Sequence, residues 1–199
     1  LGMMARANQR HLASRANDPL LTARMKSFET AFGMQAEVPD AFDLSKESDA
    51  TLALYGLKRG STGGFAWQCL IARRLAERGV RFVELIDVGA ANNWDAHGDM
   101  ATHAPLARNV DQPIAALIRD LKQRGLFDST LVVWGGEFGR LPLAQRPKND
   151  PSRSGRDDNT PAFTTWFAGG GVKGGTHYGE TDEVGQKAVV DRVSVNDLH

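Results

Sequence analysis

The sequence has no excess of charge of either sign, because its 24 lysines and arginines equal its 24 aspartates and glutamates. This balance gives no electrostatic case for binding nucleic acid or an anionic membrane surface. The single cysteine, Cys69, excludes an internal disulfide. No apolar run approaches the ~18 residues of a membrane span, and no signal-peptide pattern opens the chain. We therefore expect neither a nucleic-acid partner nor a membrane span.

The composition that is present describes an ordinary folded protein. Hydrophobic residues make up 41% of the 199 residues, charged residues 24%, and there are 8 prolines. We expect a single domain over 1–199, with a helical and loop arm over 1–60 and a core over 65–199. The chain begins at leucine and stops inside what resembles a helix start, so we expect a fragment truncated at both ends.

The arm contains one well-marked helix. Asp18 is a good N-cap and Pro19 suits the first helical position. The sequence Val38-Pro39-Asp40 predicts the end of this helix. Between these points an apolar stripe recurs at three- and four-residue steps, which predicts that one face packs on another element: Leu21, Met25, Phe28 and Phe32.

The core alternates between helical and strand patterns. A helix is predicted over 65–78, with Arg73 and Arg74 as its polar partners and Gly79 after its end. The remaining predicted elements are a strand at 80–88, a helix within 103–124, a buried strand at 130–134 and a third strand at 163–167. Helices alternating with strands over short connections are typical of an α/β fold with a mostly parallel sheet.

Polar residues follow two of these strands at their carboxyl ends, where open α/β sheets bind ligands. Asp95 and His97 form an Asp-x-His pair after the strand at 80–88. One carboxylate and one imidazole on the same side of a loop suit zinc, manganese or iron better than an all-oxygen calcium cage. The alternative is that Asp99 caps the following helix and His97 is its exposed neighbour.

A second group follows the strand at 130–134. Glu137 and Arg140 come directly after it, and Arg156 and Asp157 follow the next loop. If the strand ends converge, four side chains could surround a cation, and Arg140 and Arg156 could hold an oxyanion through bidentate hydrogen bonds. The four candidate metal ligands are Asp95, His97, Glu137 and Asp157. A solvated surface turn or a structural ion-pair network remains an alternative.

Several collinear motifs resemble one known family. They are Ala72-Arg73-Arg74-Leu75-Ala76-Glu77-Arg78-Gly79-Val80-Arg81-Phe82-Val83, Trp94-Asp95-Ala96-His97-Gly98-Asp99, Leu131-Val132-Val133-Trp134-Gly135-Gly136-Glu137-Phe138-Gly139-Arg140, Gly155-Arg156-Asp157 and Ala168-Gly169-Gly170-Gly171-Val172-Lys173-Gly174-Gly175. Through nearly its whole length the chain resembles the sulfatase-like DUF1501 family of the alkaline phosphatase-like superfamily. The resemblance implies a three-layer α/β/α fold and one or two divalent cations at the carboxyl ends of the sheet. Those cations activate a Ser/Thr-type or formylglycine nucleophile, which we expect on an early strand outside this fragment.

The resemblance also sets expectations for particular residues. Asp157 begins a motif that in the family reads Gly-Arg-Asp-His, but the histidine position here is Asp158. Glu137 stands where active superfamily members have an Asp-His pair. Asp197 and His199 match the family's Asp-Leu-His start of a late helix. Family members often carry an export signal, which implies a periplasmic or envelope-associated parent protein.

Three functional hypotheses follow from these observations. The first is a metal-dependent hydrolase of sulfate or phosphate esters, acting on a small anionic substrate such as a sulfated or phosphorylated carbohydrate. Its cofactor would be a divalent metal ion, with zinc, manganese, calcium and magnesium not distinguished. The second is a catalytically degenerate binding protein that keeps the fold, which the replacement of histidine by Asp158 favours. The third is a purely structural role for the charged residues.

Overall fold

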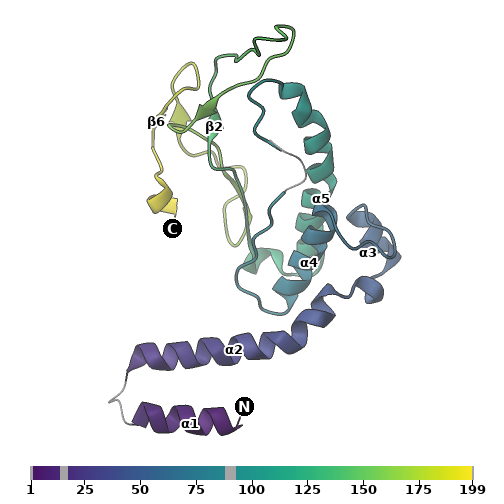
Figure 1. Cartoon of the computed structure of the whole chain (residues 1–199), viewed down its shortest axis with the longest axis vertical. Helices are drawn as coiled ribbons and strands as arrows, with labels where there is room; N and C mark the ends of the chain where they lie inside the picture. Colours follow the sequence, from purple (N-terminus) through teal and green to yellow (C-terminus); the bar gives the residue numbers. More distant parts are fainter. Residues whose placement is uncertain (1, 14–17, 88–92, 199) are drawn as a thin grey trace. The chain divides into compact units, whose positions relative to one another are not determined.

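The structure is a computed structural model that describes residues 2–13, 18–87 and 93–198. It contains two compact units, Leu1–Lys46 and Glu47–His199 (Figure 1). The prediction of one domain with an arm over 1–60 stays a prediction. No helix in the described ranges is both long and apolar enough to cross a membrane.

The first unit contains α1 (Gly2–Ala13), α2 (Pro19–Phe42) and the 3₁₀ helix η1 (Leu44–Lys46). The start of α2 is the predicted one, because the Asp18 carboxylate accepts hydrogen bonds from two backbone N–H groups of the first turn. The predicted end at 38–40 is wrong. Pro39 lies in the last turn, where its missing N–H removes only one helical hydrogen bond, and its carbonyl accepts the N–H of Asp43.

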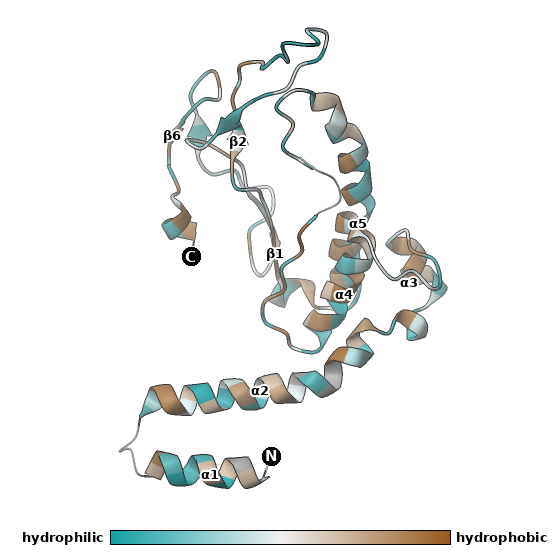
Figure 2. Cartoon of the chain, viewed as in Figure 1, coloured by the Kyte–Doolittle hydropathy of each residue, from teal (hydrophilic) through white to brown (hydrophobic). Residues whose placement is uncertain are grey.

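The predicted apolar stripe of α2 is half-buried at Leu21 and Met25 and exposed farther along the helix. The Phe28 side chain is 76% exposed, and Phe32 is exposed as well. Apolar and polar residues follow one another along the whole of α2 in Figure 2. Only the first half of the stripe is therefore partly covered, in the unit where α1 contacts α2.

The second unit is built on α3 (Asp49–Leu54), α4 (Phe65–Glu77) and α5 (His103–Gln123). Both long helices agree with the sequence prediction, and α4 contacts α5 along its length (Figure 1). Three 3₁₀ helices also lie in the described part of this unit: η2 (Met100–Thr102) directly before α5, η3 (Phe127–Ser129) between α5 and β1 (Leu131–Trp134), and η4 (Val195–Leu198) near the C-terminus. The apolar core lies between the helices and includes Leu52, Tyr55, Cys69, Leu70, Ile71, Val110, Ala116 and Leu121.

A buried ion-pair network crosses the same core. The Arg73 side chain is 1% exposed, and its guanidinium lies 2.8 Å from Glu47 Oε2, 2.7 Å from Glu77 Oε2 and 2.8 Å from Asp120 Oδ2. The Tyr55 hydroxyl donates to Asp120 Oδ2 at 3.0 Å. Burial alone would raise the pKa of the Glu47 carboxyl, but hydrogen bonds from Arg73 and its neighbour Arg74 outweigh burial and lower it. The network thus joins α3, α4 and α5 through compensated charges.

The strands form three antiparallel pairs within the described ranges. These are β1 (Leu131–Trp134) with β4 (Trp166–Gly169), β2 (Gly139–Arg140) with β3 (Asp158–Asn159), and β5 (Glu180–Thr181) with β6 (Ala188–Val190). The strand predicted at 163–167 thus overlaps β4. A single antiparallel bridge joins Gln145 and Gly155.

The predicted three-layer α/β/α fold with a mostly parallel sheet is therefore wrong. The segment 80–87 forms no strand, and its Phe82 side chain is 81% exposed; Val88, the predicted strand end, lies outside the described residues. Strand β1 does form, but Leu131 and Val133 are exposed instead of buried. The chain returns from β1 through a long irregular segment and pairs antiparallel, so no helical crossover of the kind a parallel pair requires links β1 and β4.

Candidate metal centre

The candidate site is built from three irregular segments, 94–100, 139–145 and 154–159, which lie side by side through backbone hydrogen bonds. Gly155 and Gln145 exchange two such bonds, each of 2.8 Å. The short pair β2–β3 continues this contact, with Arg140 directly opposite Asp158. Residues from distant parts of the sequence are thus fixed beside one another by the main chain.

Gly155 allows this close approach. A β-carbon at this position would overlap the carbonyl groups of Ala96 and His97. The neighbouring Arg156 N–H donates to Ala96 O at 3.3 Å. A side chain larger than hydrogen would therefore push the Asp-x-His loop away from the segment that follows Gly155.

Asp95, His97 and Asp158 each direct one potential ligand atom toward a common point, and these atoms all lie within 4.8 Å of one another. His97 Nε2 is 2.8 Å from Asp95 Oδ1 and 4.0 Å from Asp158 Oδ1. The imidazole side chain is 37% exposed, so solvent reaches the cluster. Two carboxylates and one imidazole form an Asp/His/Asp cluster at the surface.

The other nitrogen of the His97 ring faces away from this point. His97 Nδ1 is 3.2 Å from Gln145 Oε1 and 3.3 Å from Asp157 Oδ1. Both oxygens can accept a hydrogen bond from an Nδ1–H group, which would leave the Nε2 lone pair free for a cation. Histidines that bind metals are commonly oriented by such a carboxylate or amide partner.

Arg140 neutralises the two carboxylates of the cluster. Its Nη1 lies 2.7 Å from Asp95 Oδ1 and 2.8 Å from Asp158 Oδ1, and the side chain is 23% exposed. The hydrogen bond from Arg140 is the main cause of the lowered pKa of Asp95, which His97 lowers further. Asp95 is therefore an anion down to a lower pH than an ordinary aspartate.

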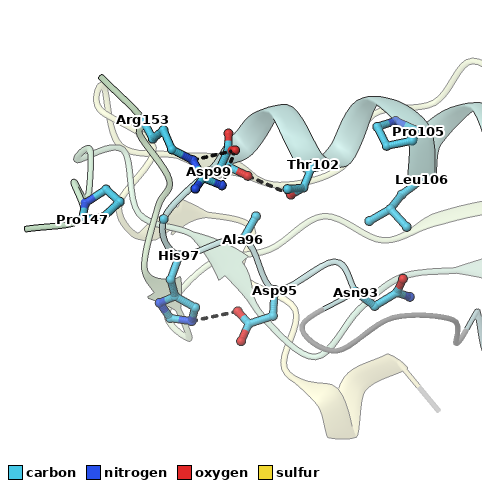
Figure 3. Close-up of a pocket in the computed structure, with 11 residues that line it drawn as sticks. Asn93, Asp95, Ala96, His97, Asp99, Thr102, Pro105, Leu106, Pro147 and Arg153 are labelled. Atoms are coloured by element: carbon cyan, nitrogen blue, oxygen red, sulfur yellow. Dashed lines mark hydrogen bonds and ion pairs between the residues drawn. The ribbon is translucent and has the colours of Figure 1, made fainter. Parts of the chain in front are cut away.

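A cavity of about 580 Å³ opens beside the cluster. In Figure 3, Asp95 and His97 point toward one another at one side, and the ion pair of Asp99 with Arg153 lies at the other. Asp99 also accepts the Ala101 N–H at 2.9 Å and so caps η2, as the capping alternative predicts. The cavity lining is Asn93, Asp95, Ala96, His97, Gly98, Asp99, Thr102, Pro105, Leu106, Pro147 and Arg153.

Two separations within the cluster can be compared with those of the ligands around a small divalent cation. Zn–N and Zn–O bonds are about 2.1 Å long, so two ligand atoms of one ion lie at most about 4.2 Å apart. The separations of His97 Nε2 from Asp95 Oδ1 and Asp158 Oδ1, 2.8 Å and 4.0 Å, fall within that limit, and all three donor atoms lie within 4.8 Å of one another. A mixed nitrogen and oxygen donor set suits zinc, manganese or iron.

The structure brings most, but not all, of the predicted site residues together. Asp95, His97, Asp157 and Arg140 are adjacent, although Asp157 contacts the far side of the imidazole. Glu137 is exposed, and no hydrogen bond or ion pair joins its side chain to another residue in the described ranges. Its position after the Gly135-Gly136 turn directs it into solvent.

Arg156 likewise contributes its main chain and not its guanidinium. Its carbonyl lies 3.5 Å from Arg140 Nη1, whereas its side chain is exposed and makes no ion pair with a described residue. Asp158, which departs from the histidine of the family motif, supplies the third donor of the cluster. Its pairing opposite Arg140 could have been suspected only from the register of β2 and β3.

The remaining histidines have other surroundings. His103 Nε2 lies 2.8 Å from Trp94 O, and its ring packs on Trp94 with centroids 5.5 Å apart, so it supports the loop before Asp95. Asp197 accepts hydrogen bonds from Ser194, which lower its pKa. Its predicted partner His199 lies outside the described residues.

Comparison with known proteins assigns the chain to a family. No curated protein and no solved structure matches the chain. The model of the family described as "Protein of unknown function (DUF1501)" matches residues 1–199. This match confirms the DUF1501 part of the resemblance found in the sequence motifs, and the chain therefore belongs to the DUF1501 family.

Proposed function

We propose that this protein is a metal-dependent hydrolase of sulfate or phosphate esters, with Asp95, His97 and Asp158 as ligands of a divalent cation. The convergence of these three donors within 4.8 Å is the observation that supports the proposal most strongly. The mixed donor set of one imidazole and two carboxylates favours zinc, manganese or iron over calcium. The donors come from the Asp-x-His loop and from strand β3, and close packing around Gly155 holds these segments in place.

The surrounding residues have roles consistent with this chemistry. Asp157 and Gln145 orient the His97 ring through Nδ1. A divalent cation, when bound, would supply Lewis-acid polarisation of an ester oxygen. Arg140, which contacts the two carboxylates of the cluster, would bind a sulfate or phosphate group through two parallel hydrogen bonds if its guanidinium left them. Asp95, His97 and Asp158 would thus hold the cation, and Arg140 would hold the anionic ester beside it.

The cavity beside the cluster suits a small organic substrate. Ligand pockets commonly enclose about 300–1,000 Å³, and this cavity of about 580 Å³ is within that range. Its wall carries both polar groups, such as Asn93 and Thr102, and apolar ones, such as Leu106. We propose a sulfated or phosphorylated carbohydrate as the substrate class.

A second candidate is a binding protein without hydrolytic activity. Arg140 already compensates the carboxylates of Asp95 and Asp158, so the cluster is electrostatically satisfied without an ion. Asp158 also replaces the histidine that the family motif carries. Such a protein would bind an anionic ester and release it unchanged.

A hydrolysis screen separates the two candidates. The protein is treated with a chelator, dialysed, and assayed on aryl sulfates, aryl phosphates and sulfated sugars with zinc, manganese, calcium or magnesium. The hydrolase proposal predicts turnover that appears only with metal and is lost in Asp95→Ala but kept in Asp111→Asn, an exposed site on α5. Binding of the same esters with no turnover under any metal would favour the second candidate.

A further inference from the structure

Arg140 shares its carboxylate partners with the candidate cation. Nη1 contacts Asp95 Oδ1 and Asp158 Oδ1, and these are the same two oxygen atoms that lie nearest His97 Nε2. A divalent cation coordinated by these oxygens would lie next to a guanidinium that carries the same sign of charge. Cation and Arg140 therefore compete for one pair of acceptors.

The contacts of Arg140 outside the cluster are weaker. Its Nη2 is 3.4 Å from Trp94 O, and its Nη1 is 3.5 Å from Arg156 O. Both are neutral carbonyl acceptors at the long limit of hydrogen-bond distance. Among the described residues, the two carboxylates thus provide the main attraction that keeps the guanidinium in place.

A guanidinium displaced from the carboxylates becomes available to an oxyanion. Guanidinium groups bind sulfate and phosphate through paired N–H donors. Arg140 would remain anchored at its place in β2, opposite Asp158, and hence within side-chain reach of whatever the cation binds. One residue could therefore neutralise the empty site and hold the anion in the loaded site.

We propose that Arg140 is an exchangeable counter-ion: a divalent cation at Asp95, His97 and Asp158 displaces it from the carboxylates, and the freed guanidinium then binds the anionic group of the ester. The inference rests on the proposed function. It adds that cation and oxyanion bind cooperatively. By linkage, the factor by which Mn²⁺ strengthens sulfate binding equals the factor by which sulfate strengthens Mn²⁺ binding.

Calorimetric titration of the full chain tests this exchange, with Mn²⁺ alone, with sodium sulfate alone, and with each in the presence of the other. For the unaltered protein we expect each ligand to bind at least about 5-fold more tightly when the other is present. Arg140→Gln removes the competing charge, so we expect Mn²⁺ to bind about 10-fold or more tightly and the coupling to disappear. Arg140→Lys keeps the charge, so we expect Mn²⁺ affinity near that of the unaltered protein, with weaker sulfate binding.

Arg146→Gln is the matched control, because it removes an exposed arginine from the same segment and should change neither affinity. Circular dichroism of each variant establishes that it is folded. If Arg140→Gln does not fold, the comparison is made with Arg140→Lys. If Mn²⁺ binds equally to the unaltered protein and Arg140→Gln, and independently of sulfate, the exchange is wrong while the metal site stands. If no variant binds Mn²⁺ or Zn²⁺, both the exchange and the proposed function are wrong.

Discussion

At the residue scale, the site depends on the absence of a side chain at position 155. The main chain of 154–156 contacts the Ala96–His97 loop so closely that only hydrogen fits on the α-carbon of Gly155. The geometry of the donors is therefore a consequence of backbone packing. A small side chain added at Gly155 should displace the donor atoms of the cluster.

We predict that Gly155→Ala displaces the Asp-x-His loop. The added methyl group would meet backbone carbonyls that cannot rotate away, so we expect a loss of about 1–3 kcal/mol in the free energy of unfolding and at least 10-fold weaker cation binding. Gly136→Ala is the control, because a β-carbon there meets nothing within 4 Å. Urea unfolding and Mn²⁺ titration measure both effects. Equal unfolding free energies and equal Mn²⁺ affinities in the two variants would contradict this role of Gly155.

Asp157 provides a second test at this scale. Its carboxylate contacts Nδ1 of His97 on the side away from the proposed cation. An orienting partner of this kind typically contributes 10–100-fold to metal affinity, so we predict a loss in that range for Asp157→Ala. Asp95→Ala, which removes a ligand, should lose binding altogether. Equally complete loss in both variants would assign Asp157 to the ligands themselves.

At the scale of elements, the charged network between α3, α4 and α5 is the most strongly buried polar feature of the second unit. Arg73 and Arg74 were predicted as ordinary polar partners of α4, yet both are buried against the carboxylate of Glu47. Arg124 joins the network from the end of α5 with a 2.6 Å contact to Glu77. The helices are thus held by compensated charges as well as by apolar packing.

We predict that Glu47→Gln lowers the free energy of unfolding by about 3–5 kcal/mol, because it leaves buried guanidinium charge uncompensated. Arg59→Gln breaks the exposed pair with Asp49 and should cost no more than about 1 kcal/mol. Chemical denaturation of both variants gives the comparison. A cost for Glu47→Gln as small as that for Arg59→Gln would show that the network does not stabilise the fold.

Elements that depend on local signals could be predicted from the sequence, whereas pairings between distant segments could not. Helices α4 and α5 were predicted because their apolar spacing and terminal glycines are local signals. The pairing of β1 with β4 joins residues more than thirty positions apart, and an apolar run fits a parallel and an antiparallel partner equally well. The Asp95–His97 pair was predictable from its spacing, whereas the role of Asp158 depends on the register of two-residue strands.

At the scale of the whole molecule, the free energy of unfolding should fall at acidic pH. The pKa of Glu47 lies below its ordinary value of 4.5, and that of Asp95 lies below 3.8. Carboxyls with lowered pKa values stabilise the folded state above their ordinary values, and this stabilisation is lost as the pH falls through the folded-state values. Protonation of Glu47 and protonation of Asp95 therefore both destabilise the folded protein as the pH falls.

We predict that the urea midpoint is nearly constant above about pH 5 and falls progressively from about pH 4.5 downward. Glu47→Gln should start from a lower midpoint and lose less of it over the same interval, because one of the responsible carboxyls is gone. Denaturation series at several pH values measure both slopes. Parallel curves for the two proteins would contradict the assignment of this pH dependence to Glu47.

The central claim is that Asp95, His97 and Asp158 together bind a divalent cation. Elemental analysis tests it most directly, after the protein has been incubated with Zn²⁺ or Mn²⁺ and freed of unbound ion by gel filtration. The account predicts about one ion per chain in the unaltered protein and in Asp111→Asn, and almost none in Asp95→Ala and Asp158→Ala. Metal content that is negligible in every protein, or equal in all four, would contradict it.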